Sequence, residues 1–176
     1  LLIFSLTAVP TSVFAACFGD TEVVAEYLFF NGVGNIATNT GIDGDDGNLT
    51  LTNGVSFSTN TPPVNSECGW SVSLPHSGSG STTPALESEG FYDPLEGASN
   101  FTIMAWVKRE STSTGSNTSA RIISDVNSSG DGAEFRFSGS TGKLAMRING
   151  TERSTSSATV SPTNNQWHHV AVVYDG

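Results

Sequence analysis

The stretch Phe101 to Lys108, "FTIMAWVK", decides the fold class of this chain. In an extended chain, successive side chains point to opposite sides. One side would carry the apolar residues Phe101, Ile103, Ala105 and Val107, and the other would carry Trp106 among more polar neighbours. This period of two predicts a β-strand with one face packed in a core.

Similar segments lie on both sides of this strand. Strands are expected at residues 22–30, 121–126, 133–139, 143–150 and 166–176, separated by turns rich in Gly and Asn. No segment shows sustained helical periodicity with caps. Short strands at this spacing predict an all-β fold, either a sandwich or a jelly roll.

The charge of the chain excludes one class of partner. Seven Lys and Arg stand against 17 Asp and Glu, which gives a net charge of −10, and no other Lys or Arg precedes Lys108. Binding of nucleic acid needs clustered basic side chains, so we expect no nucleic-acid partner. An acidic surface suits divalent cations and neutral ligands such as sugars.

The first residues have the character of an export signal. Residues 1–15, "LLIFSLTAVPTSVFA", form an apolar run that ends in small residues, which is typical of a secretory signal cleaved after Ala15 or Ala16. The run is too short for a transmembrane helix. We expect one domain over residues 17–176, secreted or displayed at the cell surface, with no integral membrane span. An alternative is a lipobox at residues 14–17, in which Cys17 carries a lipid.

Cys17 and Cys68 are the only cysteines of the chain. Two cysteines in one small exported domain most often pair, so we expect a disulfide between them. Closing a loop of about 50 residues would contribute about 4 kcal/mol in the chain-entropy description.

The closing segment "QWHHVAVVYDG", residues 166–176, combines two histidines, a tryptophan and an acid, which are residue types found in active sites. On a strand, Trp167 and His169 share one face and His168 lies on the other, so the two histidines cannot serve one site. No nucleophile elbow accompanies them. We therefore expect Trp167 and His169, together with Trp106, to be packing residues of the core, and we assign no catalytic residue.

The segment Asp43-Gly-Asp-Asp-Gly-Asn48 carries three carboxylates, those of Asp43, Asp45 and Asp46. Such close carboxylates repel one another unless water or a cation separates their charges. Calcium takes six to eight oxygen ligands, and loops of this composition supply them. The sequence therefore predicts a calcium site at these three residues, with a solvated acidic turn as the alternative.

Several segments together resemble the laminin-G-like domains of the concanavalin A-like lectin/glucanase superfamily. They are "AEYLFFNG", "GIDGDDGNLTLTNG", "FTIMAWVKRE", "RIISD" and "WHHVAVVYDG", in this order from about Val23 to Gly176. The resemblance implies a jelly roll of two antiparallel sheets, often with a calcium ion. It also implies a non-catalytic module that binds carbohydrate or a surface or matrix protein. The family pattern continues beyond "YDG", which implies a domain truncated at its C-terminus.

Two other functions stay open at this point. Catalytic members of the same superfamily hydrolyse glucans with two carboxylates, and Glu87 and Glu89 are the pair that keeps a glycan-active enzyme open. The chain can also be a structural domain of a larger surface protein. The sequence identifies no ligand-binding residues, although Trp70, Phe91, Tyr92 and Trp106 are candidates by residue type.

Overall fold

The computed structural model describes residues 2–5, 23–63, 70–75, 83–90, 92–95, 97–109, 120–138, 143–159 and 165–176. The chain divides into two compact units, Leu1–Pro94 and Leu95–Gly176. In the described residues the regular structure is β except for one short 3₁₀ turn, and every strand pair within a unit is antiparallel. The expected all-β fold of antiparallel sheets is confirmed. Within the described part of the chain, no helix has the length and apolar character needed to cross a membrane.

The first unit contains two small groups of strands. β2 (Ile36–Ala37), β3 (Leu49–Thr52) and β6 (Ala85–Ser88) form one sheet in the order β2-β3-β6. β5 (Ser71–Leu74) pairs on one side with β4 (Ser56–Ser58) and on the other with β1 (Leu2–Ser5). β1 therefore lies within the segment expected to be a signal sequence, and cleavage after Ala15 stays a prediction.

A small apolar core holds the first unit together. Phe29, Ala37, Leu51 and Val72 are buried, and Trp70 is one of the half-buried apolar residues packed against them. The prediction of a strand at residues 22–30 is wrong. The described residues of this range form only one isolated bridge, from Tyr27 to Asn39. Phe29 has a φ of 55°, in the left-handed region, and this interrupts an extended chain.

The second unit contains the strand that decided the fold class. β7 (Asn100–Arg109) pairs along its whole length with β12 (Trp167–Asp175). A four-stranded sheet runs in the order β11-β10-β9-β8. Its strands are β8 (Arg121–Ser124), β9 (Ala133–Ser138), β10 (Lys143–Ile148) and β11 (Thr151–Thr159).

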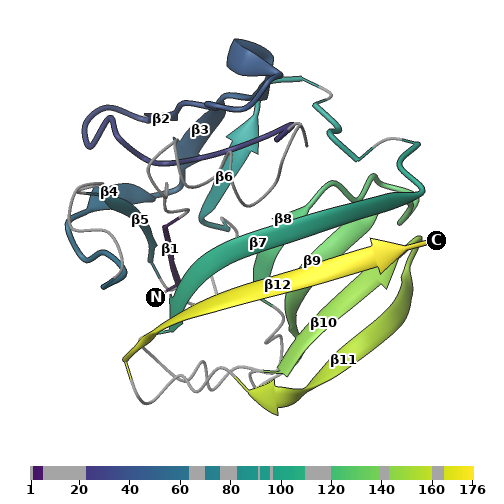
Figure 1. Ribbon diagram of the computed structural model, residues 1–176. Coiled ribbons are helices and arrows are strands. Elements are labelled where there is room, and N and C mark those ends of the chain that lie inside the picture. The colour runs from purple at the N-terminus through teal and green to yellow at the C-terminus, as the bar shows by residue number, and fades with distance from the viewer. Residues whose placement is uncertain are drawn as a thin grey trace. The chain divides into compact units, whose positions relative to one another are not determined.

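The β7–β12 pair packs across the four-stranded sheet, in front of it in Figure 1. Ile103 and Val107 of β7 are buried, as the alternation predicted, and so are Phe135 and Phe137 of β9. The guanidinium carbon of Arg109, on the same face of β7, lies 4.9 Å from the ring centroid of Phe137. This contact shows that the apolar faces of β7 and β9 face each other.

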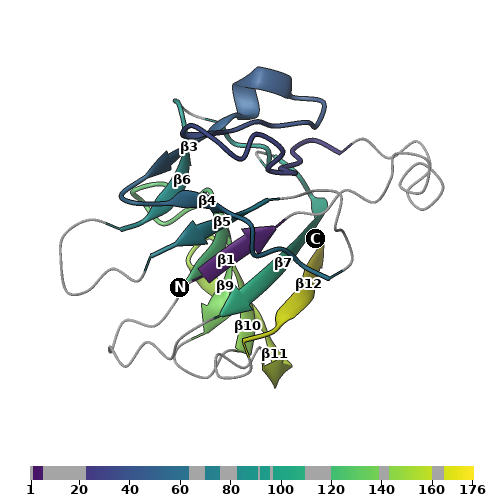
Figure 2. The same ribbon diagram turned by 90° about the vertical axis from the view of Figure 1, so that its left-hand side faces the viewer.

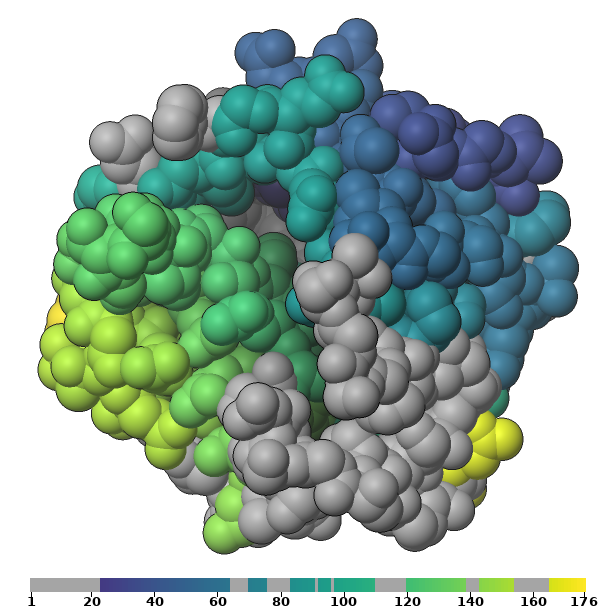
Figure 3. Space-filling model, turned by 180° about the vertical axis from the view of Figure 1, so that it is seen from behind, coloured from purple at the N-terminus to yellow at the C-terminus, as the bar shows by residue number. Residues whose placement is uncertain are grey.

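β10 and β11 are joined by a two-residue turn, Asn149-Gly150. Both residues have positive φ, 48° and 72°, which is the geometry of the turn type that matches the twist of paired strands. The outward face of this sheet carries the side chains that alternate with Phe135 and Phe137. Figure 3, seen from behind, shows the surface over β8 to β11 in green to yellow-green.

Candidate functional site

The acidic segment forms a short 3₁₀ turn, η1 (Gly44–Gly47), with Asp43 before it and Asn48 after it. We call residues 43–48 the acidic turn. It stands beyond the ends of β3 and β6 in two perpendicular views (Figures 1 and 2). Asp45 and Asp46 are exposed, whereas Gly47 is buried.

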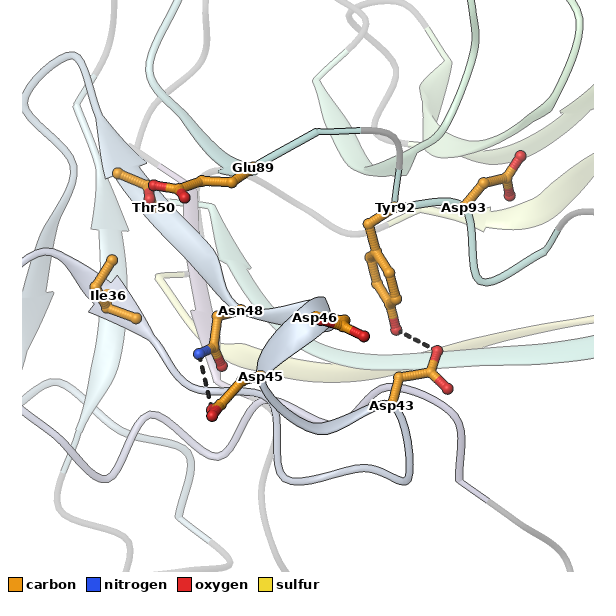
Figure 4. A pocket seen from close by; sticks show the side chains of 9 residues that line it. All are labelled: Ile36, Asp43, Asp45, Asp46, Asn48, Thr50, Glu89, Tyr92 and Asp93. Atoms are coloured by element: carbon orange, nitrogen blue, oxygen red, sulfur yellow. Dashed lines mark hydrogen bonds between the residues drawn. The ribbon is translucent and has the colours of Figure 1, made fainter.

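Two tyrosines from distant parts of the chain hold the acidic turn. The Tyr27 hydroxyl donates a hydrogen bond of 2.6 Å to the carbonyl oxygen of Gly47. The Tyr92 hydroxyl donates one of 2.9 Å to Oδ2 of Asp43 (Figure 4). The turn is thus fixed at both of its ends by aromatic side chains that approach it from outside the segment.

Two asparagines complete the anchoring of the turn. The backbone N–H of Asn39 donates to Oδ1 of Asn48 at 2.8 Å, and Nδ2 of Asn48 donates to Oδ1 of Asp45 at 3.1 Å. Asn39 is only 4 % exposed, and its Oδ1 accepts hydrogen bonds from the backbone N–H groups of Glu26 and Gly41. The side-chain oxygen of Asn39 therefore accepts hydrogen bonds from backbone N–H groups, as a carbonyl oxygen of a neighbouring strand would.

The pKa values of both tyrosines are raised. Burial, assisted by the negative charge of Asp43, raises the pKa of Tyr27 from 10.0 to about 12. Burial and the hydrogen bond to Asp43 also raise the pKa of Tyr92 well above its ordinary value. Both hydroxyls consequently stay protonated, and remain hydrogen-bond donors, throughout the neutral range.

The acidic turn forms one wall of an open pocket of about 780 Å³. Polar side chains dominate its lining, and five of them are carboxylates. The lining residues are Ile36, Asp43, Asp45, Asp46, Asn48, Thr50, Glu89, Tyr92 and Asp93 (Figure 4). Residues 1–94 contain ten Asp and Glu and no Lys or Arg, so no lysine or arginine of this unit neutralises the pocket.

The three predicted calcium ligands lie at one turn but do not converge on one point. Asp43 turns toward Tyr92 and Asp45 toward Asn48 (Figure 4). Among the residues that the structure describes, no three His, Cys, Asp or Glu side chains are close enough to share a metal ion. The hydrogen bond from Tyr92 engages only Oδ2 of Asp43, so the calcium site at these three residues stays a prediction.

The other candidates from the sequence fall in different places. Glu89 lines the pocket, whereas Glu87, two residues earlier on β6, is exposed and is not part of the lining. Trp70 belongs to the core of the first unit. Cys17, Cys68 and Phe91 lie outside the described residues, so the disulfide stays a prediction.

The expected core role of the β7–β12 aromatic residues needs correction. His169 is exposed, and Trp106 and Trp167 are half-buried. The His169 ring contacts the Trp106 ring across the strand pair in a tilted arrangement, with ring centroids 5.2 Å apart, on the face turned away from β9. The prediction that His169 is a buried packing residue is wrong, because both faces of β12 are apolar and the alternation alone does not say which one is inward.

Sequence reasoning named Tyr92 by residue type alone and missed Tyr27 and Asn39, which also anchor the pocket. Tyr27 lies 20 positions before its partner Gly47, and Tyr92 lies 49 positions after Asp43. Asn39 carried no motif. No local pattern connects residues at these separations, so the sequence indicated the acidic turn, Glu89 and Tyr92 separately and not that they share one pocket.

Comparison with known families gives one match. Residues 77–176 match a laminin-G family described as the concanavalin A-like lectin/glucanases superfamily. Neither the curated proteins nor the solved structures that were compared with the chain gave a match. Glu89, Tyr92 and Asp93 lie inside the matched range, whereas the acidic turn precedes it. Because the match covers more than half of the chain, the protein belongs to the laminin-G-like branch of the concanavalin A-like lectin/glucanase superfamily.

Proposed function

We propose that this chain is a non-catalytic binding module, secreted or displayed at the cell surface, that holds a neutral glycan in the acidic pocket. Membership of a superfamily of binding domains supports the general class. Export is supported by the apolar segment at residues 1–15. The observation that carries the proposal is the pocket lined by five carboxylates beside an asparagine, a threonine and a tyrosine.

The lining favours sugar hydroxyls over other ligand groups. Carboxylate and amide oxygens accept hydrogen bonds from hydroxyl groups, and an aromatic ring such as that of Tyr92 offers a face to the apolar side of a sugar ring. Five carboxylates in a unit without lysine or arginine repel uronate, sulfate and phosphate groups. The ligand class is therefore a neutral oligosaccharide, and an extracellular protein would bind here through its glycans.

The test is a binding measurement with matched variants. Neutral and anionic oligosaccharides are titrated by calorimetry against the wild type, Glu89→Gln and Glu87→Gln. We expect neutral oligosaccharides to bind and anionic ones not to bind. The Glu89→Gln variant should bind neutral oligosaccharides about tenfold more weakly, because it loses a hydrogen bond to a charged group. Glu87→Gln is the control, because this exposed residue has the same charge and lies outside the pocket. Equal effects of both variants, or no binding of any neutral sugar, would sink the proposal.

The same variants test the enzymatic alternative. Hydrolysis requires a second carboxylate acting with the first on one glycosidic bond. If the chain is an enzyme, Glu89→Gln retains binding and abolishes release of reducing sugar. For the binding module we expect no reducing sugar from the wild type at any neutral glycan tested.

Calcium at Asp43, Asp45 and Asp46 remains a separate proposal. It is supported by the density of carboxylates, of which Asp43 is held at Oδ2 by the Tyr92 hydroxyl. Unfolding is followed in EDTA and in calcium at matched ionic strength. Binding predicts about 2.7 kcal/mol of stabilisation at a hundredfold excess over the dissociation constant, lost in Asp45→Ala and Asp46→Ala. Equal stability in both solutions leaves the segment a solvated turn.

A further inference from the structure

The turn between β10 and β11 carries a chemically reactive pair of residues, Asn149 and Gly150, and both are exposed. When glycine follows asparagine, the backbone nitrogen of the glycine can attack the amide carbon of the asparagine side chain. The glycine has no side chain that would hinder this attack. The chain contains three such pairs, Asn31-Gly32, Asn53-Gly54 and Asn149-Gly150, and their surroundings in the fold differ.

Asn53 and Asn149 lie in turns of closely similar backbone geometry. The φ angles are 52° at Asn53 and 86° at Gly54, and they are 48° at Asn149 and 72° at Gly150. Both pairs therefore form turns of two left-handed residues. The reaction starts from nearly the same backbone conformation at both pairs, so a difference in reactivity has to come from the hydrogen bonds of the two side chains.

The amide nitrogen of the asparagine is held in the first two pairs. Nδ2 of Asn53 donates a hydrogen bond of 2.7 Å to the carbonyl oxygen of Thr83. Nδ2 of Asn31 donates to Oγ1 of Thr38 at 3.0 Å and to the carbonyl oxygen of Ile36 at 3.4 Å. Because Nδ2 is the leaving atom, these hydrogen bonds must break before the side chain can react. The fold therefore slows the reaction at Asn31 and Asn53.

The amide of Asn149 is held in the opposite sense. Its Oδ1 accepts a hydrogen bond of 2.9 Å from the backbone N–H of Gly132. Among the described residues, neither Nδ2 of Asn149 nor the N–H of Gly150 has a hydrogen-bond partner. Attack at Cγ places negative charge on Oδ1, and an N–H already directed at this oxygen stabilises that charge. The leaving group and the attacking nitrogen are thus both free, and the carbonyl is polarised.

We propose that Asn149 deamidates spontaneously in the folded protein, and that it is the one of the three asparagines that the fold leaves reactive. The nitrogen of Gly150 bonds to Cγ of Asn149, the Cγ–Nδ2 bond breaks, and Nδ2 leaves as ammonia with the amide proton of Gly150. Water then opens the resulting cyclic imide. Breaking the new N–Cγ bond leaves aspartate, and breaking the original peptide bond leaves isoaspartate.

Isoaspartate at position 149 would lengthen the main chain of the turn by a methylene group. The turn is held from both sides at this point. The N–H of Asn149 donates to the carbonyl oxygen of Gly132 at 2.8 Å, and the carbonyl oxygen of Gly150 accepts from Nη2 of Arg147 at 2.6 Å. A longer main chain between these two groups cannot satisfy both hydrogen bonds, so the turn loosens.

Arg147 transmits this change to a buried carboxylate of the same sheet. Its Nη1 forms an ion pair of 3.4 Å with Glu134, which is 2 % exposed. Glu134 also pairs with Nε of Arg121 and, at 3.5 Å, with Nε of Arg136. Loosening of the turn therefore weakens one of three ion pairs around Glu134, and deamidation lowers the stability of the second unit irreversibly as the protein ages.

Peptide mapping of the aged protein tests the proposal. The folded chain is incubated in mildly alkaline solution, which promotes loss of the proton from the attacking nitrogen. Mass spectrometry detects replacement of the amide by an acid, and chromatography separates isoaspartate from aspartate. We expect Asn149 to react about tenfold faster than Asn53 or Asn31, the effect of about one hydrogen bond on a barrier. In denaturant the three rates should be comparable, because the hydrogen bonds of the fold are absent.

Two variants separate the causes. Thr38→Val removes one acceptor of the Asn31 amide at nearly constant volume, so Asn31 should react faster while Asn149 keeps its rate. Asn149→Asp keeps both the oxygen that faces Gly132 and the length of the main chain. This variant should melt close to the fresh wild type and should not change at this position on ageing. The aged wild type should melt lower, in proportion to its isoaspartate at position 149.

Three results would each overturn the inference. The first is an equal rate at Asn53 and Asn149 in the folded chain, and the second is modification of Asn31 or Asn53 while Asn149 stays intact. The third is an unchanged rate of Asn31 in a folded Thr38→Val variant, which would show that hydrogen bonds to Nδ2 do not protect the amide. Circular dichroism of each sample verifies that the chain is folded during the incubation.

Discussion

Gly47 illustrates how closely single residues determine the pocket. A Cβ at this position would overlap Nδ2 of Asn39 and would lie 2.9 Å from Cζ of Tyr92. Neither neighbour can withdraw easily, because the amide oxygen of Asn39 is held by two backbone N–H groups and the ring of Tyr92 by its bond to Asp43. Position 47 therefore has no room for a side chain.

We expect Gly47→Ala to destabilise the fold by about 2 kcal/mol, the usual range for inserting a methyl group into a packed site. The free energy of unfolding in denaturant measures it. Asp46→Ala, at the exposed neighbouring position, serves as the control and should change stability by less than about 0.5 kcal/mol. Equal stability of both variants would mean that the contact of Gly47 with Asn39 and Tyr92 is looser than described.

Tyr27 makes the stability of the fold depend on pH in the alkaline range. Its pKa of about 12 in the folded chain lies above the value of 10.0 in the unfolded chain, so folding favours the protonated hydroxyl. The contribution is fully present below about pH 10 and is lost as the pH rises through about 12. Tyr92, whose pKa is also raised, acts in the same direction.

Unfolding measured from about pH 8 to about pH 11.5 should show a decline in stability above pH 10. The Tyr27→Phe variant should be less stable at pH 8 by about 1 kcal/mol, the value of one hydrogen bond, and should decline less steeply. A wild type and a Tyr27→Phe variant with parallel pH profiles would refute the raised pKa of Tyr27.

At the scale of elements, alternate residues of β9 pack in the core and form ion pairs on the outward face. Phe135 and Phe137 face β7, while Glu134 and Arg136 face outward. The sequence alternation of this strand was visible beforehand. The burial of Glu134 was not, because it depends on arginines from β8 and β10 that lie 13 positions away in either direction.

Glu134→Gln should destabilise the second unit by about 3 kcal/mol, since it leaves three guanidinium groups without their shared carboxylate. The matched control is Glu152→Gln. Glu152 is 40 % exposed and pairs with Arg136, so we expect a loss of no more than about 1 kcal/mol. Thermal and denaturant unfolding measure both, and equal losses would show that Glu134 does not hold the network together.

The strands of the second unit were largely predictable, whereas the orientation of β12 was not. Residues 101–108 have a clear apolar side, and Ile103 and Val107 are buried on it. β12 is apolar on both faces, so its pattern fits either orientation. Val170 is buried and Val173 is 71 % exposed, a difference set by the sheet that covers only one face.

At the scale of the whole molecule, the separation of charge predicts an unusual response to salt. Ten carboxylates without a lysine or arginine repel one another within residues 1–94, and added salt weakens this repulsion. Raising the ionic strength from about 0.01 M to about 0.15 M shortens the Debye length from about 30 Å to about 8 Å.

We therefore expect the melting temperature to rise with sodium chloride over this range. The rise should be smaller in an Asp45→Asn, Asp46→Asn double variant, which removes two of the repelling charges. Arg153→Gln, in the second unit, should not change the response. A melting temperature that falls with salt would show that attractive ion pairs outweigh the repulsion.

The fold class and the acidic turn could be predicted from the sequence because both are local patterns. Alternation within one strand and three carboxylates within four residues need no knowledge of distant partners. The pocket could not be predicted, because Tyr27, Asn39 and Tyr92 reach the turn only through the tertiary structure. The uneven distribution of charged residues along the chain can be read from the sequence. Which basic residues share one face of the sheet depends on the strand register.

The register of β10 has a practical consequence for attaching the protein to a sensor surface. The chain contains two lysines, and Lys108 is only 6 % exposed, whereas Lys143 lies on the same face of β10 as Arg147. Reagents that couple through lysine amines will therefore immobilise the molecule mainly at Lys143. Molecules attached in this way have this face of the four-stranded sheet against the support.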